Sequence, residues 1–344
     1  MSNKEHQEID ALGEFGLIDV LTSEAVLGKE SSIKGIGDDA AVIQSFAGES
    51  KLFSSDMLVE GVHFNLAYVP LKSLGFKAIS VNVSDILAMN GTPEQITISL
   101  GISSKFPVEA LKELYKGVYA ACEYYGVDLV GGDTTSSYSG LIISVSIMGT
   151  VNSEKVIYRS GAKENDLLIV TGDVGSSYLG LQILEREKGV FNTNPEIQPK
   201  LEGYDDLIKK QLQPIARQDV IEFFREVDFT PTAMIDVSDG LASEIMHLSK
   251  NSACSFSVYS DKLPLSEKSI LTATELGLDP YVAAMNGGED YELLFTANQK
   301  DYEKLKGNPN LSIIGFVTDQ SNSNLLIDKN DTAVEISAQG WKHF

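Results

Sequence analysis

The chain has 344 residues, with 27 basic and 49 acidic side chains and a formal net charge of −22. A chain this acidic repels the phosphates of nucleic acids and of anionic membranes, which excludes both as main partners. If its substrates are themselves anionic, a cation such as a metal ion must mediate their binding. At roughly 150 residues a domain we expect two domains. The two cysteines stand in no disulfide or zinc spacing, so we expect a cytoplasmic protein. No apolar stretch reaches about 18 residues, so we expect no membrane span.

The first half of the sequence alternates strand-like and helix-like segments. Residues 95–102 alternate apolar and small side chains with a period of two, which is typical of a strand with one buried face. Residues 107–125 carry apolar side chains at helical spacing, with Pro107 near the start and Gly126 as the cap. In chain order, the sequence predicts an extended run at 52–55, a helix at 71–89, a strand at 95–102, a helix at 107–125 and a strand at 141–151.

The second half repeats this alternation after a polar stretch at 152–165, where we place the domain boundary. The predicted domains are therefore 1–155 and 156–344. Residues 189–214 are polar and contain three prolines, so we expect a long surface excursion there. The elements predicted in this half are a strand at 167–171, helices at 178–188 and 220–227, a strand at 234–237, a helix at 241–249 and strands at 291–296 and 311–318. Together they predict an α/β or α+β protein of two lobes.

Aspartates recur beside glycines or serines and at the expected ends of strands. Glycine lets the backbone approach a ligand closely, and carboxylate oxygens are the hard ligands that Mg²⁺ prefers. Asp85 differs, because it stands among apolar side chains of the helix at 71–89, where a carboxylate needs a partner. Since Mg²⁺ takes only one or two carboxylates and fills its other positions with water and phosphate oxygens, the set predicts several magnesium ions around a polyphosphate.

Each of these features alone also fits a purely structural role. Gly131-Gly132-Asp133 is a common turn sequence, Asp39 can cap a helix or turn, and an isolated histidine such as His63 often only packs. The usual nucleotide-binding frameworks are absent from the sequence. Gly35-Ile36-Gly37 lacks the third glycine of a dinucleotide fingerprint, and neither a Walker loop nor a His-Arg-Asp catalytic loop occurs. Any nucleotide chemistry must therefore use another arrangement.

Taken in order, the motifs resemble the thiamine-monophosphate kinase family over nearly the whole chain. A single motif is a weak signal, but the ordered set is specific. The motifs are Gly35-Ile36-Gly37-Asp38-Asp39-Ala40-Ala41, Ser54-Ser55-Asp56, Glu60-Gly61-Val62-His63-Phe64, residues 78–85, Gly131-Gly132-Asp133-Thr134-Thr135, Arg159-Ser160-Gly161-Ala162, Asp236-Val237-Ser238-Asp239-Gly240-Leu241 and Gly287-Gly288-Glu289-Asp290-Tyr291-Glu292-Leu293. The segments Gly13-Glu14-Phe15 and Gly340-Trp341-Lys342-His343-Phe344 also resemble the ends of that family.

The resemblance implies transfer of the γ-phosphoryl group of ATP to thiamine monophosphate, giving thiamine diphosphate and ADP. It also implies the fold shared with aminoimidazole ribonucleotide synthetase. In that fold the sheet of an N-terminal α/β lobe, which binds ATP and Mg²⁺, helps form a barrel across a homodimer, and a C-terminal α/β lobe follows. The implied transfer is direct, and no residue is expected to act as a covalent nucleophile.

Positions that match the family motifs carry the implied roles. The implied magnesium ligands are Asp39, Ser54, Ser55, Asp56, Asp85, Asp133, Asp236 and Asp239. The implied ATP contacts are Tyr115, Gly132, Asp133, Arg159 and Ser238. The implied substrate contacts are His63, Glu289 and Trp341, the sole tryptophan, which also fits as a packing anchor for the tail.

The sequence departs from the family pattern at one place and leaves two alternatives open. Where relatives often have Arg-Pro-x-x-Arg, this chain has Gln213-Pro214-Ile215-Ala216-Arg217, so the resemblance does not carry a phosphate contact over to the first of these positions. One alternative is another ATP-dependent enzyme of the same superfamily, such as aminoimidazole ribonucleotide synthetase, a selenophosphate synthetase or a hydrogenase-maturation relative. The last two normally carry a reactive cysteine near one end, whereas Cys122 lies in a predicted helix and Phe344 ends the chain. The other alternative is a magnesium-nucleotide-binding regulator without turnover.

Overall fold

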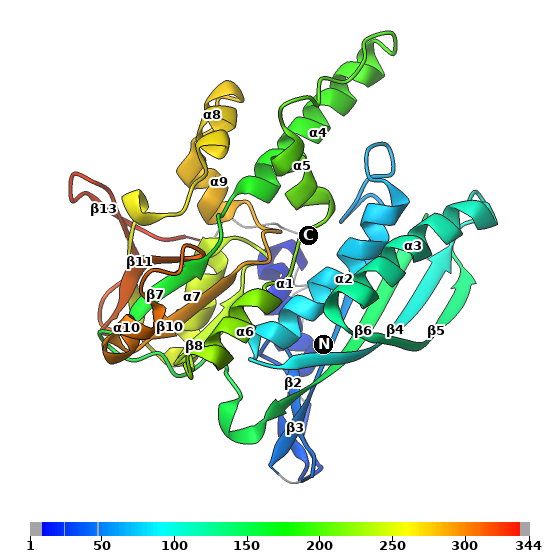
Figure 1. The fold of residues 1–344 in the computed structure, drawn as a ribbon. Coiled ribbons are helices and arrows are strands. Elements are labelled where there is room, and N and C mark those ends of the chain that lie inside the picture. The colour runs from blue at the N-terminus through cyan, green and yellow to red at the C-terminus, as the bar shows by residue number, and fades with distance from the viewer. Residues whose placement is uncertain (1–8, 24, 47, 338–344) are drawn as a thin grey trace, which may run out of the picture.

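The structure, a computed structural model, describes residues 9–23, 25–46 and 48–337. Two mixed β-sheets, each covered by helices, make up these parts of the chain (Figure 1). The first sheet uses strands up to Asn152 and the second begins at Leu167, on either side of the predicted boundary. The predicted α/β class with two lobes is confirmed, while the division into 1–155 and 156–344 stays a prediction.

The first sheet has the strand order β1-β2-β3-β6-β4-β5. All neighbours are antiparallel except β4 and β5, which run parallel. Its strands are β1 (Ser32–Lys34), β2 (Ala41–Gln44), β3 (Glu49–Val59), β4 (Thr92–Ile102), β5 (Asp128–Ser136) and β6 (Ile142–Asn152). On β6 every second side chain is buried, so one face of the sheet meets the core and the other does not.

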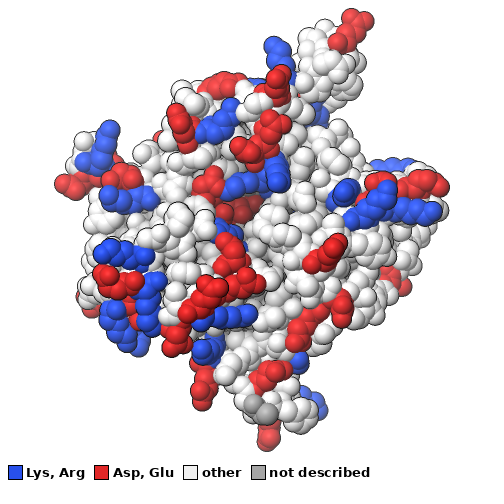
Figure 2. Space-filling view, viewed as in Figure 1, with Lys and Arg blue, Asp and Glu red and all other residues white. Residues whose placement is uncertain are grey.

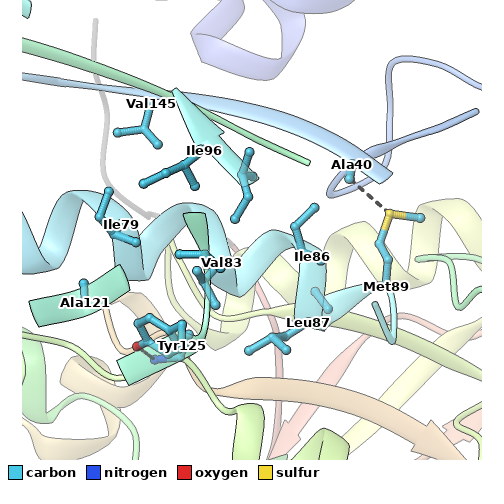
Figure 3. Close-up of a cluster of buried hydrophobic side chains, with 14 of the residues drawn as sticks. Ala40, Ile79, Val83, Ile86, Leu87, Met89, Ile96, Ala121, Tyr125 and Val145 are labelled. Carbon is cyan, nitrogen blue, oxygen red and sulfur yellow. Dashed lines mark hydrogen bonds between the residues drawn. The ribbon is translucent and has the colours of Figure 1, made fainter. Parts of the chain in front are cut away.

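Helix α2 (Leu71–Ala88) is buried along most of its length. It begins after Pro70 and ends before Asn90, whose φ of 62° cannot continue a right-handed helix. Side chains on one side of α2 pack against Ile96 and Val145 of the first sheet, and Figure 3 shows α3 (Val108–Tyr125) on another side. The opposite flank of α2 contacts the second half of the chain. The helix therefore connects the two lobes.

The second sheet has the strand order β13-β12-β9-β11-β7-β10-β8. Its strands are β7 (Leu167–Thr171), β8 (Ala233–Asp236), β9 (Ser255–Tyr259), β10 (Leu293–Ala297), β11 (Leu311–Thr318), β12 (Leu325–Ile327) and β13 (Ala333–Glu335). The remaining helices are α1 (Ile9–Thr22), α4 (Ser176–Thr193), α5 (Asp205–Leu212), α6 (Gln218–Glu226), α7 (Leu241–Ser252), α8 (Glu267–Glu275), α9 (Pro280–Asn286) and α10 (Tyr302–Leu305). On the face of the molecule seen in Figure 2, acidic and basic side chains are intermixed over both lobes.

The predicted elements are present, with three differences that matter for the site. The run at 52–55 is the middle of the eleven-residue β3, so Asp56 lies within a strand and not at its end. Gly131-Gly132-Asp133 likewise lies within β5 and is not a turn. The region 189–214 is not one surface excursion, because it contains the end of α4 and the whole of α5, whose Leu207 is buried. None of the helices among the described residues is both long and apolar enough to cross a membrane.

Candidate functional site

Three carboxylates from distant parts of the chain meet beside α2. Asp39 lies just before β2, Asp85 lies on α2, and Asp236 ends β8. One carboxylate oxygen of each lies within 4.8 Å of those of the other two. The helix brings them together, since α2 contacts β3 on one flank and β8 on another. We call Asp39, Asp85 and Asp236 the acidic cluster.

Serine hydroxyls orient two members of the acidic cluster. Ser54 on β3 donates a hydrogen bond to Asp85, and Ser84 on α2 donates one to Asp236 at 2.6 Å. Asp56 is two residues beyond Ser54 on the same strand, so both side chains share the face of the sheet that meets α2. Ser54 and Asp56 therefore border the cluster, and their role as magnesium ligands stays a prediction.

Arg159 supplies positive charge to the acidic cluster. Its Nη2 donates to Asp39 Oδ1 at 2.7 Å, and its backbone N–H donates to Asp38 at 3.1 Å. The other carboxylate oxygen of Asp39 is buried and has no hydrogen-bond donor among the described residues. A buried acceptor atom that lacks a donor is costly. A cation bound at the cluster would satisfy it.

Burial and mutual repulsion disfavour the charged form of the cluster. Burial raises the pKa of Asp85 well above its usual value, and the carboxylates of Asp56, Asp236 and Asp39 raise it further. Burial, followed by repulsion from Asp39, raises the pKa of Asp236 to about 8. A divalent cation would reverse this effect, because a bound ion favours the deprotonated form of its ligands.

The donor set of the cluster fits Mg²⁺. The groups at hand are carboxylate and hydroxyl oxygens, which are the hard ligands of this ion, whereas zinc sites use sulfur and imidazole nitrogen. Mg²⁺ also keeps several positions for water and phosphate oxygens. The cluster could therefore hold magnesium together with a nucleotide polyphosphate.

A second polar centre lies in the loop 287–292, which precedes β10. Gly288 and Glu289 both have a left-handed backbone, with φ of 71° and 59°. The N–H of Glu289 donates to Ser238 O at 2.6 Å, so this loop is attached to the turn that follows Asp236. The carboxylate of Glu289 makes an ion pair with Lys77 Nζ at 2.8 Å. The predicted substrate contact thus lies close in the fold to the predicted metal site.

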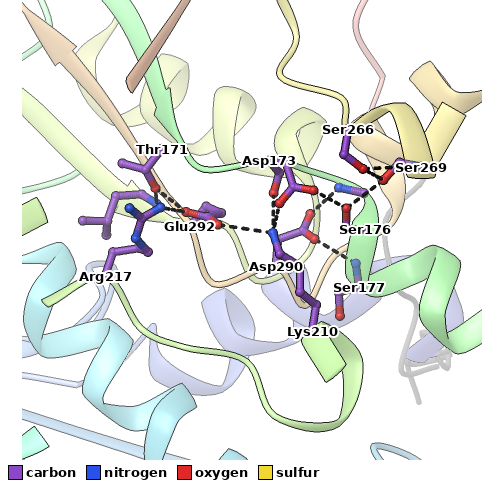
Figure 4. A network of polar contacts seen from close by, with 12 residues as sticks. Thr171, Asp173, Ser176, Ser177, Lys210, Arg217, Ser266, Ser269, Asp290 and Glu292 are labelled. Carbon is purple, nitrogen blue, oxygen red and sulfur yellow. Dashed lines mark hydrogen bonds and ion pairs between the residues drawn. The ribbon is translucent and has the colours of Figure 1, made fainter. Parts of the chain in front are cut away.

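A network of buried charges holds this loop in place (Figure 4). Asp290 accepts the N–H groups of Gly175 at 2.6 Å and Ser177 at 3.2 Å at the start of α4, and burial raises its pKa to about 7. Arg217 makes an ion pair with Glu292 at 2.5 Å. Arg217 is the second arginine of the Arg-Pro-x-x-Arg pattern, and its contacts here are with the protein itself.

His63 lies in the loop after β3. Its Nδ1 accepts the N–H of Val59 at 3.0 Å, which fixes the orientation of the ring. The same loop is tied to α4, where Tyr68 donates to Glu185 at 2.7 Å. The predicted substrate residue is therefore held at the junction between the two lobes.

Two predicted magnesium ligands, Ser55 and Asp133, lie on the opposite face of the first sheet. Asp133 pairs with Ser99 of β4, in a row of paired residues that continues through β6 to Met57 of β3. Residues directly paired in neighbouring strands point to the same side. Asp133 therefore shares the exposed side of Met57, as does Ser55, whereas Asp56 points toward α2. A single chain does not bring Ser55 or Asp133 to the acidic cluster.

The other predicted residues have varied surroundings. A Cβ atom on Gly132 would lie 1.8 Å from Ile98 O, so glycine is required there for β5 to pair with β4. Tyr115 lies on α3, and its ring packs against Tyr119 with centroids 5.8 Å apart. Ser238 and Asp239 form the turn after β8, next to Asp236. Trp341 lies outside the described residues.

Three buried polar residues that support the site were not predicted from the sequence. Glu244 on α7 accepts the N–H of Asp239 at 3.0 Å, and Asn82 on α2 accepts the N–H of Asp56 at 3.2 Å. Lys77 pairs with Glu289. Lys77 and Asn82 have the same sequence signal as Asp85, a polar side chain within an apolar helical run. That signal could have identified both of them.

The chain is similar to known proteins over almost its whole length. Residues 37–151 match the family model of AIR synthase related protein, N-terminal domain. The chain is 34% identical over 334 residues to the thiamine-monophosphate kinase of Aquifex aeolicus, covering 97% of this chain and 98% of that protein. It is 33% identical over 339 residues to that of Bacillus subtilis, covering 97% and 100%. The solved structure of AaThiL complexed with AMPPCP and TMP has a TM-score of 0.84 at 32% identity, covering 99% of this chain and all of that one.

Proposed function

This chain belongs to the thiamine-monophosphate kinase family, and from that premise we infer that it transfers the γ-phosphoryl group of ATP to thiamine monophosphate, forming ADP and thiamine diphosphate. It is a phosphotransferase whose acceptor is itself a phosphate group. The observation that carries the proposal is the acidic cluster beside Arg159, an arrangement suited to divalent cations and, through them, to polyphosphate.

Asp39, Asp85 and Asp236 would hold the magnesium, with Ser54, Asp56 and Asp239 around them. Magnesium held by these residues would supply positive charge that offsets the negative charge of the phosphates. We propose more than one ion, because the acidic side chains around the cluster exceed the one or two carboxylates that a single Mg²⁺ uses. The chain's own contribution is to hold these carboxylates in fixed positions through Ser54 and Ser84.

The proposed mechanism is a direct in-line transfer. Both reactants are anions, and Arg159 adds a fixed positive charge that reduces their repulsion. The phosphate of thiamine monophosphate is already largely ionised near neutral pH, because a phosphomonoester has a second pKa of about 6. A strong general base is then unnecessary, and positioning of the two phosphates supplies most of the rate. No residue has to become phosphorylated.

The remaining site residues are assigned by family resemblance and by their place in the fold. We propose that Tyr115, Gly132 and Ser238 contact ATP together with Arg159. His63 and Glu289, both at the junction of the lobes, would contact thiamine monophosphate. Trp341 is proposed as a third substrate contact on the resemblance alone.

We propose that the enzyme is a homodimer, in which a second copy covers the outer face of the first sheet. That face leaves large apolar side chains accessible, with Phe53 46% and Met57 53% exposed. It also carries Ser55 and Asp133, two family-implied ligands that the single chain keeps away from its own cluster. A sheet of the second copy closing a barrel against this face would bury the apolar side chains, and each copy's Asp133 would serve the cluster of the other.

The test is an assay of ATP-dependent thiamine diphosphate formation in the presence of Mg²⁺. We expect turnover by the wild-type chain and a loss of about a hundredfold or more in Asp85→Asn, which removes a proposed ligand but keeps the shape of the side chain. Glu303→Gln is the matched control, because Glu303 is an exposed acid on α10. Binding of ATP with Mg²⁺ but no thiamine diphosphate from the wild-type chain would contradict the proposed function.

A further inference from the structure

Lys77 is a buried lysine for which the proposed phosphoryl transfer has no role. Its side chain is only 3% exposed, in the middle of α2. Its Nζ lies 2.8 Å from Glu289 Oε1 and donates a hydrogen bond to Gln211 O at 3.3 Å. Burying an ammonium group is costly unless it is paired and hydrogen-bonded. The fold therefore retains a charged group at this place with two specific partners.

The carboxylate of Glu289 is held at both of its oxygens. Lys77 contacts Oε1, and Gln211 Nε2 donates to Oε2 at 2.6 Å. Gln211 is itself fixed, because its Oε1 accepts the hydroxyl of Ser177 at 2.7 Å. Left-handed backbone at a residue other than glycine, as at Glu289, is strained and persists only where the surroundings enforce it. Backbone and side chain of Glu289 are thus both constrained.

The acidic cluster and Glu289 are held by the same stripe of α2. Lys77 and Ser84 are seven residues apart, which is about two turns of helix, so both project from one side of α2. Ser84 donates to Asp236, and Lys77 pairs with Glu289. The loops of Asp236 and Glu289 also join each other through the hydrogen bond from Glu289 N to Ser238 O. These contacts form a closed ring that begins and ends on the helix that carries Asp85.

We propose that Lys77 is a positioning residue for the acceptor substrate. It fixes the Glu289 carboxylate at a set place relative to the acidic cluster, so that thiamine monophosphate held by Glu289 presents its phosphate to the nucleotide. The inference rests on the proposed function and deepens it. Lys77 acts through Glu289, and it acts on the acceptor side of the reaction and not on the binding of ATP.

The test is a double-mutant cycle read in steady-state kinetics. Lys77→Met keeps the length of the side chain but removes its charge, and we expect it to raise the KM for thiamine monophosphate about tenfold while the KM for ATP stays within about twofold. Glu289→Gln should raise this KM at least as much, because it also alters the proposed contact with the substrate. Because Lys77 acts through Glu289, the double variant should resemble Glu289→Gln instead of showing the product of both effects.

Two further variants separate positioning from a general loss of stability. Lys77→Arg keeps the charge and should restore part of the affinity for thiamine monophosphate. If Lys77→Met does not fold, the cycle is run with Lys77→Arg instead. Lys77→Arg should then shift the KM for thiamine monophosphate when Glu289 is intact, and it should have no further effect when combined with Glu289→Gln. Lys304→Met is the matched control, since Lys304 on α10 pairs with Asp301 and belongs neither to the proposed site nor to the first sheet, and it should leave both KM values unchanged.

The outcomes distinguish this inference from the function on which it rests. A wild-type chain that makes no thiamine diphosphate overturns the proposed function and the inference together. An active wild type with an unchanged KM for thiamine monophosphate in folded Lys77→Met overturns the inference alone. Independent, multiplying effects of Lys77→Met and Glu289→Gln also overturn it, because Lys77 would then not act through Glu289.

Discussion

Asp85 shows at the scale of one residue how the site is built at the expense of stability. Its carboxylate lies on a helix whose other residues are nearly all buried, and it faces Asp39 and Asp236 within 4.8 Å. Burial raises its pKa well above the usual value, and the neighbouring carboxylates add to the effect. Such a group is costly in the absence of a cation. Its retention is explained by the ligand it would bind.

We predict that Asp85→Asn is more stable than the wild type in the absence of divalent cations. The change removes a like charge, and the amide oxygen can still accept the hydrogen bond of Ser54, so we expect a gain of about 1 kcal/mol. Since the pKa of Asp85 is higher in the folded than in the unfolded chain, the folded form holds the proton more tightly. The wild type therefore loses stability as the pH rises, and the advantage of the variant should grow from pH 5 to pH 8.

Thermal unfolding with and without Mg²⁺ checks this prediction. Mg²⁺ should stabilise the wild type by binding the folded form, whereas Asp85→Asn should respond weakly. The exposed-site variant Glu303→Gln should behave as the wild type does. An Asp85→Asn chain that is less stable than the wild type without Mg²⁺, or that gains as much from Mg²⁺, would refute the assignment of Asp85 to a metal site.

Some site residues could be selected from the sequence and others could not. Asp85 was selected because a carboxylate in an apolar helix needs a partner, and the structure provides the cluster. The same argument applies to Lys77, which was not predicted from the sequence and whose partner Glu289 is far away in the sequence. The pairing of Arg159 with Asp39 joins residues 120 positions apart, and no local spacing encodes it. Sequence patterns therefore predict which groups need partners, but the fold decides which partners they have.

At the scale of elements, the contact between α2 and α3 depends on two glycines. A Cβ atom on Gly117 would lie 1.8 Å from Lys72 O, and one on Gly75 would lie 2.0 Å from Leu114 O. The two helices thus touch through their backbones. Any side chain there would push α3 away from the helix that carries Asp85 and Lys77.

We predict that Gly117→Ala destabilises the fold by about 3 kcal/mol, because a methyl group has no room against a backbone carbonyl. Gly189→Ala is the matched control. Gly189 lies within α4, and a methyl group added to it would have no other atom within 4 Å. Alanine is the better helix former, so Gly189→Ala should raise the free energy of unfolding by up to about 1 kcal/mol. Urea unfolding of both variants measures the difference. Equal free energies of unfolding for the two variants would contradict this prediction, because α2 and α3 would then be able to move apart with little loss of stability.

Element types were predicted better than the places of residues within elements. The helices at 71–89 and 107–125 and the strand at 95–102 follow from strong periodicity and clear end signals, and they match α2, α3 and β4. Glycine-rich segments misled the prediction, because Gly131-Gly132-Asp133 reads as a turn although it lies within β5. Gly132 serves a close approach of two strands instead of a change in chain direction.

At the scale of the whole molecule, the first sheet separates the proposed ligands onto two faces. Asp56 points toward α2, while Asp133 points to the outer face with Met57. The sequence could not predict this, because the side of the sheet to which a residue points depends on strand register, and a shift of one residue reverses it. The register leaves two explanations for Asp133. Either it has no part in the site, or it serves the site of a second copy.

Subunit complementation decides between these two explanations. Asp85→Asn and Asp133→Asn should each be inactive alone if both residues serve catalysis. In a dimer whose sites combine Asp85 of one copy with Asp133 of the other, a mixed dimer of the two variants has one intact site and one site lacking both groups. With random pairing half of the dimers are mixed, so co-expression of the two variants should recover about one quarter of the wild-type activity. Dimers isolated through two different tags should show about half. No recovery, with each variant folded and dimeric, would contradict a site shared between two copies, and full activity of Asp133→Asn alone would remove Asp133 from the reaction.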